Sequence, residues 1–174
     1  MNKKYQTKHI RQTRRSFLKT SLFAGAAAGM TAKSWAQVKG ANDTLNAATV
    51  GFRGRGGSHI SSIRGMQQRE QGVRLHALCD VDRNVLKAGA SKHKVKGYLD
   101  MREMFEDKDL DIVTIATPNH WHALAAIWAI QAGKDVYVEK PVSHNVWEGR
   151  QIVNAARKHK KIVQTGTQAR SSKC

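Results

Sequence analysis

Residues 47–60 read AATVGFRGRGGSHI, and three features of this stretch decide the fold that we expect. The run Ala47–Val50 is apolar enough for a buried strand, and a glycine-rich turn follows it at once. Beyond the turn, Ile60, Ile63 and Met66 recur at helical spacing. A glycine turn between a strand and a helix lets the backbone approach a phosphate, whose charge then rests on the amides of the helix N-terminus. The stretch therefore predicts a strand–turn–helix unit that binds phosphate.

The turn Gly51–Gly57 has the spacing G-x-x-G-x-G-G and not the strict G-x-G-x-x-G of many dinucleotide-binding folds. A glycine-rich turn alone is weak evidence, but a position between a strand and a helix is the context that dinucleotide binding requires. Two arginines in the turn add positive charge where a pyrophosphate would lie. The candidate cofactor contacts here are Gly51, Arg53, Gly54, Arg55 and Gly56.

The rest of the chain alternates between strand and helix patterns. We expect further strands at residues 73–79, 111–117, 136–138 and 162–164, and helices around 83–90, 121–132 and 145–159, with a short helix opened by a capping box at 100–103. Short strands that alternate with helices predict a parallel sheet covered on both faces. Together with the strand at 47–50, five strands are located in this way, and we expect six, the number that a doubly wound, dinucleotide-binding Rossmann fold of the α/β class requires.

Asp80 ends the second predicted strand, where a carboxylate can accept hydrogen bonds from the adenosine ribose hydroxyls of NAD. The same carboxylate repels the 2′-phosphate of NADP, so the sequence favours NAD of the two cofactors. Arg83 lies close to Asp80 in the chain, and its positive charge keeps NADP as the alternative cofactor. The alternative role for Asp80 is the N-cap of the following helix, which is compatible with cofactor binding.

Charge and cysteine content restrict the other function classes. The chain has 174 residues and a formal net charge of +17, but residues 1–36 hold eight basic residues and no acidic one. The remainder holds 22 basic and 13 acidic residues, dispersed along the chain, so we expect no nucleic-acid partner. Cys79 and Cys174 indicate neither a disulfide framework nor a zinc site. His120 and His122 face different ways at a helix start, so we expect no metal.

The first 36 residues resemble a twin-arginine (Tat) export signal. Arg14–Leu18 matches the pattern at five consecutive positions, Ser21–Met30 is a short apolar run, and Ser34–Ala36 resembles a cleavage site. These features predict a signal peptide at 1–36, a linker at 37–44, contact with the Tat machinery, and a periplasmic or secreted location. The apolar run is too short to span a bilayer, so we expect no stable membrane anchor. The alternative is an uncleaved basic arm.

Five segments in the correct order resemble the glucose–fructose oxidoreductase/inositol dehydrogenase family (Gfo/Idh/MocA), including its exported members. They are GANDTLNAATVGFRGRGGSHI, LCDVD, TIATPNHWHA, VEKPVS and QTGTQARS, and they span about residues 40–172. The resemblance implies that residues 45–174 form an NAD(P)-binding Rossmann domain. It also implies an oxidoreductase that acts on sugars, polyols or related hydroxy compounds by hydride transfer.

The resemblance further implies roles for particular residues. In this family the E-K-P strand end lies under the nicotinamide ring, so Lys140 would be catalytic and would stabilise a hydroxyl that becomes a carbonyl, or relay its proton. Without the other segments, we would interpret Glu139 and Lys140 as an exposed ion pair, and His122 as a polar residue of a first helical turn. The cofactor contacts implied in these segments are Thr117, Pro118, Asn119, His122, Glu139, Lys140, Pro141 and Gln168.

Members of this family normally continue into a C-terminal α/β domain that supplies most of the substrate pocket and the oligomer interface. Here the chain stops at SSKC, so we expect that domain to be absent, the reading frame to be truncated and oligomerisation to be doubtful. Hydride transfer requires the exclusion of water, so we expect poor catalysis from this chain alone. Two alternatives stay open: an NAD-dependent glycosidase of the same family, and a dinucleotide-binding fragment without turnover.

Overall fold

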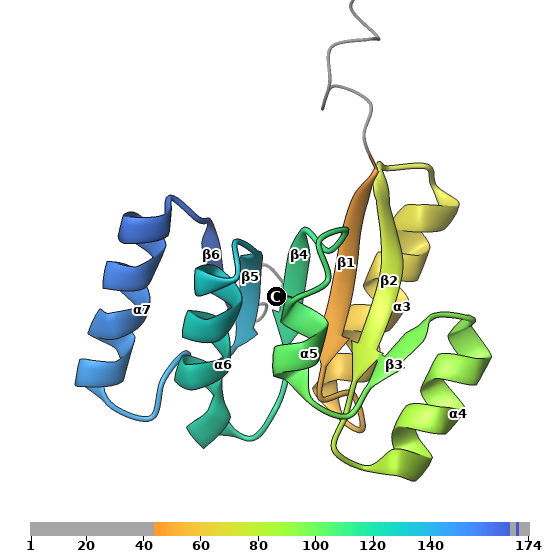
Figure 1. Ribbon diagram of the computed structural model, residues 1–174, viewed down its shortest axis with the longest axis horizontal. Coiled ribbons are helices and arrows are strands. Elements are labelled where there is room, and N and C mark those ends of the chain that lie inside the picture. Colours follow the sequence, from red (N-terminus) through yellow and green to blue (C-terminus); the bar gives the residue numbers. More distant parts are fainter. Residues whose placement is uncertain (1–43, 168–169, 171–174) are drawn as a thin grey trace, which may run out of the picture. The chain divides into compact units, whose positions relative to one another are not determined.

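The computed structural model describes residues 44–167 and Arg170 (Figure 1). The predicted signal peptide, nearly all of the linker and Gln168 lie outside these residues. The elements are β1 (Leu45–Val50), α3 (Arg55–Gln68), β2 (Val73–Cys79), α4 (Arg83–His93), β3 (Lys96–Tyr98), α5 (Met101–Phe105), β4 (Ile112–Ile115), α6 (Asn119–Gln131), β5 (Asp135–Glu139), α7 (Val146–His159) and β6 (Val163–Gly166).

The six strands form one sheet in the order β3-β2-β1-β4-β5-β6, and every neighbouring pair is parallel. The chain moves outward from β1 to β3 and then returns to the other side of β1 with β4. The carboxyl ends of β1 and β4 are therefore the point where the connections diverge, which is where open α/β sheets bind ligands. The predicted doubly wound parallel sheet is confirmed.

Helices cover both faces of the sheet (Figure 1). On one face, Ile60 and Ile63 of α3 and Leu86 of α4 pack against Leu75 and Leu78 of β2. On the other face, residues of α5, α6 and α7 pack against side chains of β1, β2, β4 and β5 in a second, larger core. Strand residues alternate between the two cores because successive side chains of a strand point to opposite faces.

Side-chain caps explain where several helices begin. Asp82 accepts hydrogen bonds from the amides of Asn84 and Val85 and caps α4. The alternative that assigned this cap to Asp80 is therefore wrong. Asp100 caps α5 by accepting from the amide of Arg102, and Asn145 caps α7 by accepting from the amide of Glu148. Each cap supplies an acceptor to amides that have no partner within the helix.

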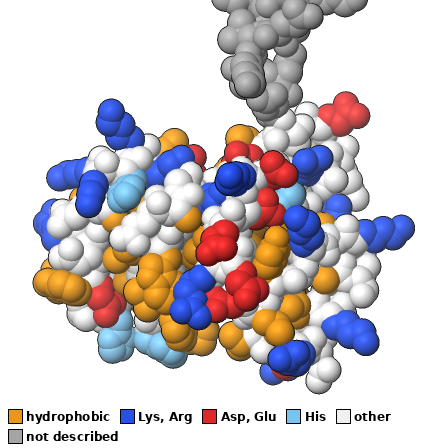
Figure 2. Space-filling view, viewed as in Figure 1, with side chains coloured by type: hydrophobic (Ala, Val, Ile, Leu, Met, Phe, Trp, Pro, Cys, Tyr) orange, Lys and Arg blue, Asp and Glu red, His pale blue; other side chains and the backbone are white. Residues whose placement is uncertain are grey.

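The space-filling view shows Lys and Arg side chains scattered over the visible face and not gathered into one stripe (Figure 2). Among the described residues, no helix combines the length and the apolar character that crossing a bilayer needs. Within 44–167 and at Arg170, no group of three or more His, Cys, Asp or Glu side chains is arranged to hold a metal ion.

Candidate functional site

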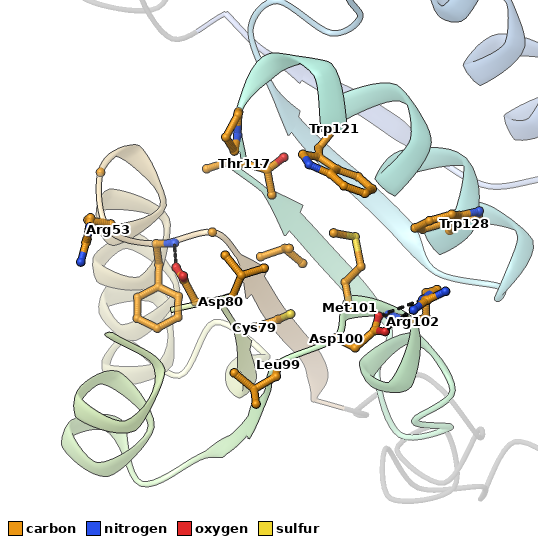
Figure 3. Close-up of a pocket in the computed structure, with 17 residues that line it drawn as sticks. Arg53, Cys79, Asp80, Leu99, Asp100, Met101, Arg102, Thr117, Trp121 and Trp128 are labelled. Carbon is orange, nitrogen blue, oxygen red and sulfur yellow. Dashed lines mark hydrogen bonds and ion pairs between the residues drawn. The ribbon is translucent and has the colours of Figure 1, made fainter. Parts of the chain in front are cut away.

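Two adjoining cavities open at the carboxyl ends of the strands, around the divergence of β1 and β4. The larger has a volume of about 550 Å³ and extends over the ends of β1 and β2 toward α5 and α6 (Figure 3). The smaller has a volume of about 250 Å³ and lies beside the end of β5. Both are lined by Ala116 and Thr117, directly after β4, so the two cavities meet at this turn.

The glycine turn forms one wall of the larger cavity and fits tightly against its neighbours. Gly51 has a φ of +73°, which favours glycine, and a Cβ on it would lie 3.0 Å from the carbonyl oxygen of Ala116. A Cβ on Gly56 would lie 2.0 Å from the carbonyl oxygen of Gly51. Gly54 precedes α3 and provides no side-chain cap for the helix amides. The turn thus brings bare backbone and an uncapped helix N-terminus to the cavity.

Asp80 lies half-buried at the end of β2 and lines the larger cavity. Its two carboxylate oxygens accept hydrogen bonds from the amides of Phe52 (3.1 Å) and Asp82 (3.0 Å), the first drawn in Figure 3. The carboxylate therefore joins the turn after β1 to the turn after β2. Arg53, which is largely exposed, pairs with Asp82 at 2.7 Å on the rim.

The far end of the larger cavity carries several large apolar side chains beside the Asp100–Arg102 ion pair, and it was not foreseen from the sequence. Its lining includes Leu99, Met101, Trp121 and Trp128, which come from the β3–α5 connection, α5 and α6 (Figure 3). The Arg102 guanidinium lies 5.9 Å from the ring centroid of Trp128. Leu99 and Trp121 stay about 37–38% exposed in the structure. Large apolar residues next to the ends of strands were the signal in the sequence that could have predicted this surface.

Cys79 lies at the end of β2, and its side chain is among the most completely buried of the core. Burial, and then the neighbouring charge of Asp80, raise the pKa of the Cys79 thiol to about 12. The thiol is consequently neutral at ordinary pH. It contributes an apolar surface to the larger cavity.

The smaller cavity is lined by charged side chains that surround a buried carboxylate. Glu139 is 3% exposed, and its Oε1 accepts from Arg55 Nε at 3.1 Å and lies 2.8 Å from His59 Nε2. Its Oε2 lies 3.3 Å from the amide nitrogen of Lys140. Burial on its own would raise the pKa of Glu139, but the hydrogen bonds from His59 and Arg55 outweigh it and hold the pKa below its usual value.

His122 is buried between the two segments that border the smaller cavity. Its ring nitrogens lie 2.6 Å from the carbonyl oxygen of Pro141 and 2.8 Å from that of Thr117. The ring thus holds the turn after β4 against the segment after β5, where the Lys140–Pro141 peptide bond is cis. An interpretation of His122 as an ordinary polar residue of a first helical turn does not fit a side chain that is 1% exposed.

The hydroxyl of Thr117 is buried, and no described residue gives it a hydrogen-bond partner. Thr117 stands where the two cavities meet, so this hydroxyl is a polar group for which a ligand at the junction would supply the missing partner.

The structure brings nearly all of the predicted site residues to one edge of the sheet. Those that line the larger cavity are Gly51, Arg53, Gly54, Asp80, Thr117 and Pro118, and those that line the smaller are Arg55, Thr117, Asn119, His122, Glu139 and Lys140. Gly56 and Pro141 line neither cavity: Gly56 packs against the Gly51 backbone, and the carbonyl oxygen of Pro141 lies 2.6 Å from a ring nitrogen of His122. The sequence interpretation missed His59, because its contact is with Glu139, 80 residues further along the chain, and no local pattern indicates it.

Comparison with known proteins places the chain among related sequences and structures. Residues 45–167 match the family model GFO_IDH_MocA, described as an oxidoreductase family with an NAD-binding Rossmann fold. The chain is 32% identical over 162 residues to a glycosyl hydrolase family 109 protein of Solibacter usitatus, covering 83% of this chain and 36% of that protein. It is 32% identical over 133 residues to inositol 2-dehydrogenase of Salmonella typhimurium, covering 75% of this chain and 39% of that protein.

Among solved structures, the WlbA dehydrogenase of Chromobacterium violaceum, crystallised with NADH and UDP-GlcNAcA, superposes with a TM-score of 0.69 at 28% identity. The match covers 75% of this chain and 37% of that one. The chain thus spans less than two-fifths of the length of each of these proteins.

Proposed function

This chain belongs to the Gfo/Idh/MocA oxidoreductase family, and from that premise we propose that its two cavities together hold one nicotinamide dinucleotide. The adenosine half occupies the larger cavity and the nicotinamide half the smaller, with the pyrophosphate at the glycine turn between them. The observation that carries this proposal is the meeting of the two cavities at Thr117, beside the N-terminus of α3. The NADH bound to the similar WlbA dehydrogenase also supports it.

Three features of the chain fit such a ligand. No side chain fits at Gly51 or Gly56, so the turn after β1 stays tight and a pyrophosphate can approach its backbone and the first amides of α3. The unpartnered hydroxyl of Thr117 suits a polar atom of the cofactor at the junction. The apolar end beside Trp121 suits the flat surface of an adenine ring.

Asp80 favours NAD over NADP. The carboxylate lines the larger cavity and has acceptor capacity left for a ribose hydroxyl, because each ionised oxygen can accept more than one hydrogen bond. A 2′-phosphate at the same place would meet like charge.

The bound cofactor would accept or donate a hydride, and Lys140 would assist at the substrate. Lys140 is exposed at the rim of the smaller cavity, where its ammonium group can stabilise the oxygen of a hydroxyl that becomes a carbonyl, or carry its proton. Sugars, polyols and related hydroxy compounds are the proposed substrates of the whole protein. A glycosidase that oxidises its substrate transiently is the second candidate, favoured by the similarity to the family 109 protein.

Export is a further part of the proposal. Residues 1–36, with Arg14 and Arg15 at the head of a short apolar run, would direct the protein through the Tat machinery to a periplasmic or secreted location. Tat export moves folded proteins, so a cofactor bound before export would be carried along.

Calorimetric titration of the purified chain with NAD, NADP and ADP-ribose tests the proposed binding. We expect heat and thermal stabilisation with NAD and ADP-ribose, and weaker binding of NADP. An absence of heat and of stabilisation with all three would refute the dinucleotide site. With a glycoside as substrate, net NADH formation would favour the dehydrogenase, and cleavage without net NADH would favour the glycosidase.

A further inference from the structure

We propose that His59 is a positioning residue for the nicotinamide end of the site, because it fixes the Glu139 carboxylate that in turn holds the backbone at Lys140. The inference rests on the proposed dinucleotide site and adds to it a residue that does not line either cavity. His59 lies on α3, 80 residues before Glu139 in the chain, so the contact joins the helix after the glycine turn to the end of β5.

The His59–Glu139 pair is closely enclosed. The side chains are 8% and 5% exposed and lie 2.8 Å apart. Tyr137 of β5 packs edge-on against the His59 ring, with the two ring centroids 5.3 Å apart. Gly166 of β6 is close as well, since a Cβ on it would come within 3.1 Å of Glu139 Oε2 and 3.0 Å of the Tyr137 hydroxyl oxygen. The carboxylate has little space in which to rotate away from His59.

The two carboxylate oxygens of Glu139 have different partners. Oε1 interacts with His59 and Arg55, whereas Oε2 interacts with the amide of Lys140. A buried carboxylate requires such partners, because burial without them disfavours its charged form. Of the two partners at Oε1, Arg55 is 46% exposed in its side chain and His59 only 8%. His59 is therefore the more firmly placed of the two.

The contact uses only one ring nitrogen of His59. Nε2 lies against Glu139, whereas Nδ1 is buried with no partner among the described residues. What the site needs from residue 59 is therefore one N–H donor at the reach of Nε2. Glutamine carries an N–H donor at a similar reach, whereas leucine fills similar space and donates nothing.

The loss of affinity that follows from removing His59 should be confined to the nicotinamide half of the ligand. Glu139 and Lys140 line the smaller cavity and are absent from the lining of the larger one. Loss of the His59 hydrogen bond should therefore weaken contacts to nicotinamide while contacts to adenosine and pyrophosphate stay as they are. NAD and ADP-ribose differ by the nicotinamide ring, so the ratio of their affinities reports on this end alone.

The test compares His59→Leu and His59→Gln with the wild-type chain by calorimetric titration with NAD and with ADP-ribose. We expect His59→Leu to bind NAD about tenfold more weakly, which corresponds to about 1.4 kcal/mol, with ADP-ribose affinity within twofold of wild type. His59→Gln should restore most of the NAD affinity.

His76→Leu is the matched control. His76 pairs with Asp107 at 3.0 Å, and the two side chains are 15% and 10% exposed, so this is another largely enclosed histidine–carboxylate pair, and neither residue lines the two cavities. This variant should lower the melting temperature and leave both affinities unchanged, which separates a loss of stability from a loss of positioning.

If His59→Leu loses affinity for NAD and ADP-ribose equally, or loses affinity for neither, His59 does not position the nicotinamide end of the site. If His59→Leu does not fold, His59→Asn decides by the same ratio, because asparagine keeps an amide N–H donor but is too short to reach Glu139 from residue 59. A wild-type chain that binds neither ligand contradicts the dinucleotide site itself, which is a different outcome.

Discussion

Replacement of Gly56 by alanine tests the glycine turn through one steric contact. The added Cβ would lie 2.0 Å from the carbonyl oxygen of Gly51, and also 3.0 Å from the carbonyl carbon of the same residue. Both are backbone atoms, so no side-chain rotation relieves the clash. The start of α3 must instead move away from the end of β1 until the contact reaches at least 3.0 Å.

The size of the effect follows from this movement. Overpacking in a well-packed region lowers the free energy of unfolding by about 1–3 kcal/mol, whereas alanine in a helix raises it by about 0.5–1 kcal/mol relative to glycine. We therefore expect Gly56→Ala to lower the free energy of unfolding by about 1–2 kcal/mol and the melting temperature by roughly 4–8 °C. A shift of the turn by about 1 Å should also weaken dinucleotide binding by about tenfold or more.

Gly57→Ala is the control for this experiment. Gly57 is the next residue of the same helical turn, and its added Cβ would meet only the Phe52 carbonyl oxygen, at an ordinary 3.6 Å. The melting temperature of Gly57→Ala should equal or slightly exceed that of wild type, and its affinity for NAD should be unchanged. Circular dichroism and calorimetric titration measure both quantities. A Gly56→Ala chain that melts and binds like Gly57→Ala would refute the close contact between the two backbone segments.

Three further predictions concern other parts of the molecule. The hydrogen bond from His76, and after it that from the Asp109 amide, hold the pKa of Asp107 in the folded chain below its value in the unfolded chain. The ionised carboxylate therefore stabilises the fold above a pH of about 4, and this stabilisation is lost as the pH falls further. The melting-temperature gap between wild type and Asp107→Asn should shrink over that acid range, and a gap that is constant with pH would contradict this. The folded Cys79 thiol should resist iodoacetamide at pH 8 and react only after unfolding, as mass spectrometry can follow; fast labelling of the folded chain would contradict its burial. Lys140→Met should leave ADP-ribose affinity unchanged, since the side chain lines the smaller cavity only, and an equal loss for ADP-ribose in titration would show that it acts elsewhere.

Most of the fold was predictable because its strands have clear patterns. The period-two run at 73–79 became β2 with the same bounds, Asp100 caps the short helix that its capping box predicted, and α7 begins at Val146, directly after the expected first residue Asn145. The strand β3 could not be located from its residues, although six strands were expected. Its sequence, KGY, is at the sheet edge and two of its residues are exposed, so it carries no apolar alternation.

The candidate site was predictable to a lesser degree. The glycine turn and Lys140 were found because glycine spacing and the E-K-P segment are local patterns, and the parallel sheet brings their strand ends to one edge. The contact of His59 with Glu139 joins residues 80 positions apart, and nothing local in the sequence indicates it. The alternative role of Asp80 as the cap of α4 was wrong because two carboxylates two residues apart both suit that role, and only the backbone geometry selects Asp82.

The double hydrogen bonding of Asp80 bears on any attempt to redesign cofactor preference. Its carboxylate faces the larger cavity and at the same time accepts from two backbone amides in different turns. A neutral, shorter residue introduced to admit a 2′-phosphate would leave both amides without their acceptor and loosen the two turns together. Designs that aim to bind NADP should therefore keep Asp80 and add positive charge around it, with Val81 as a suitable exposed position.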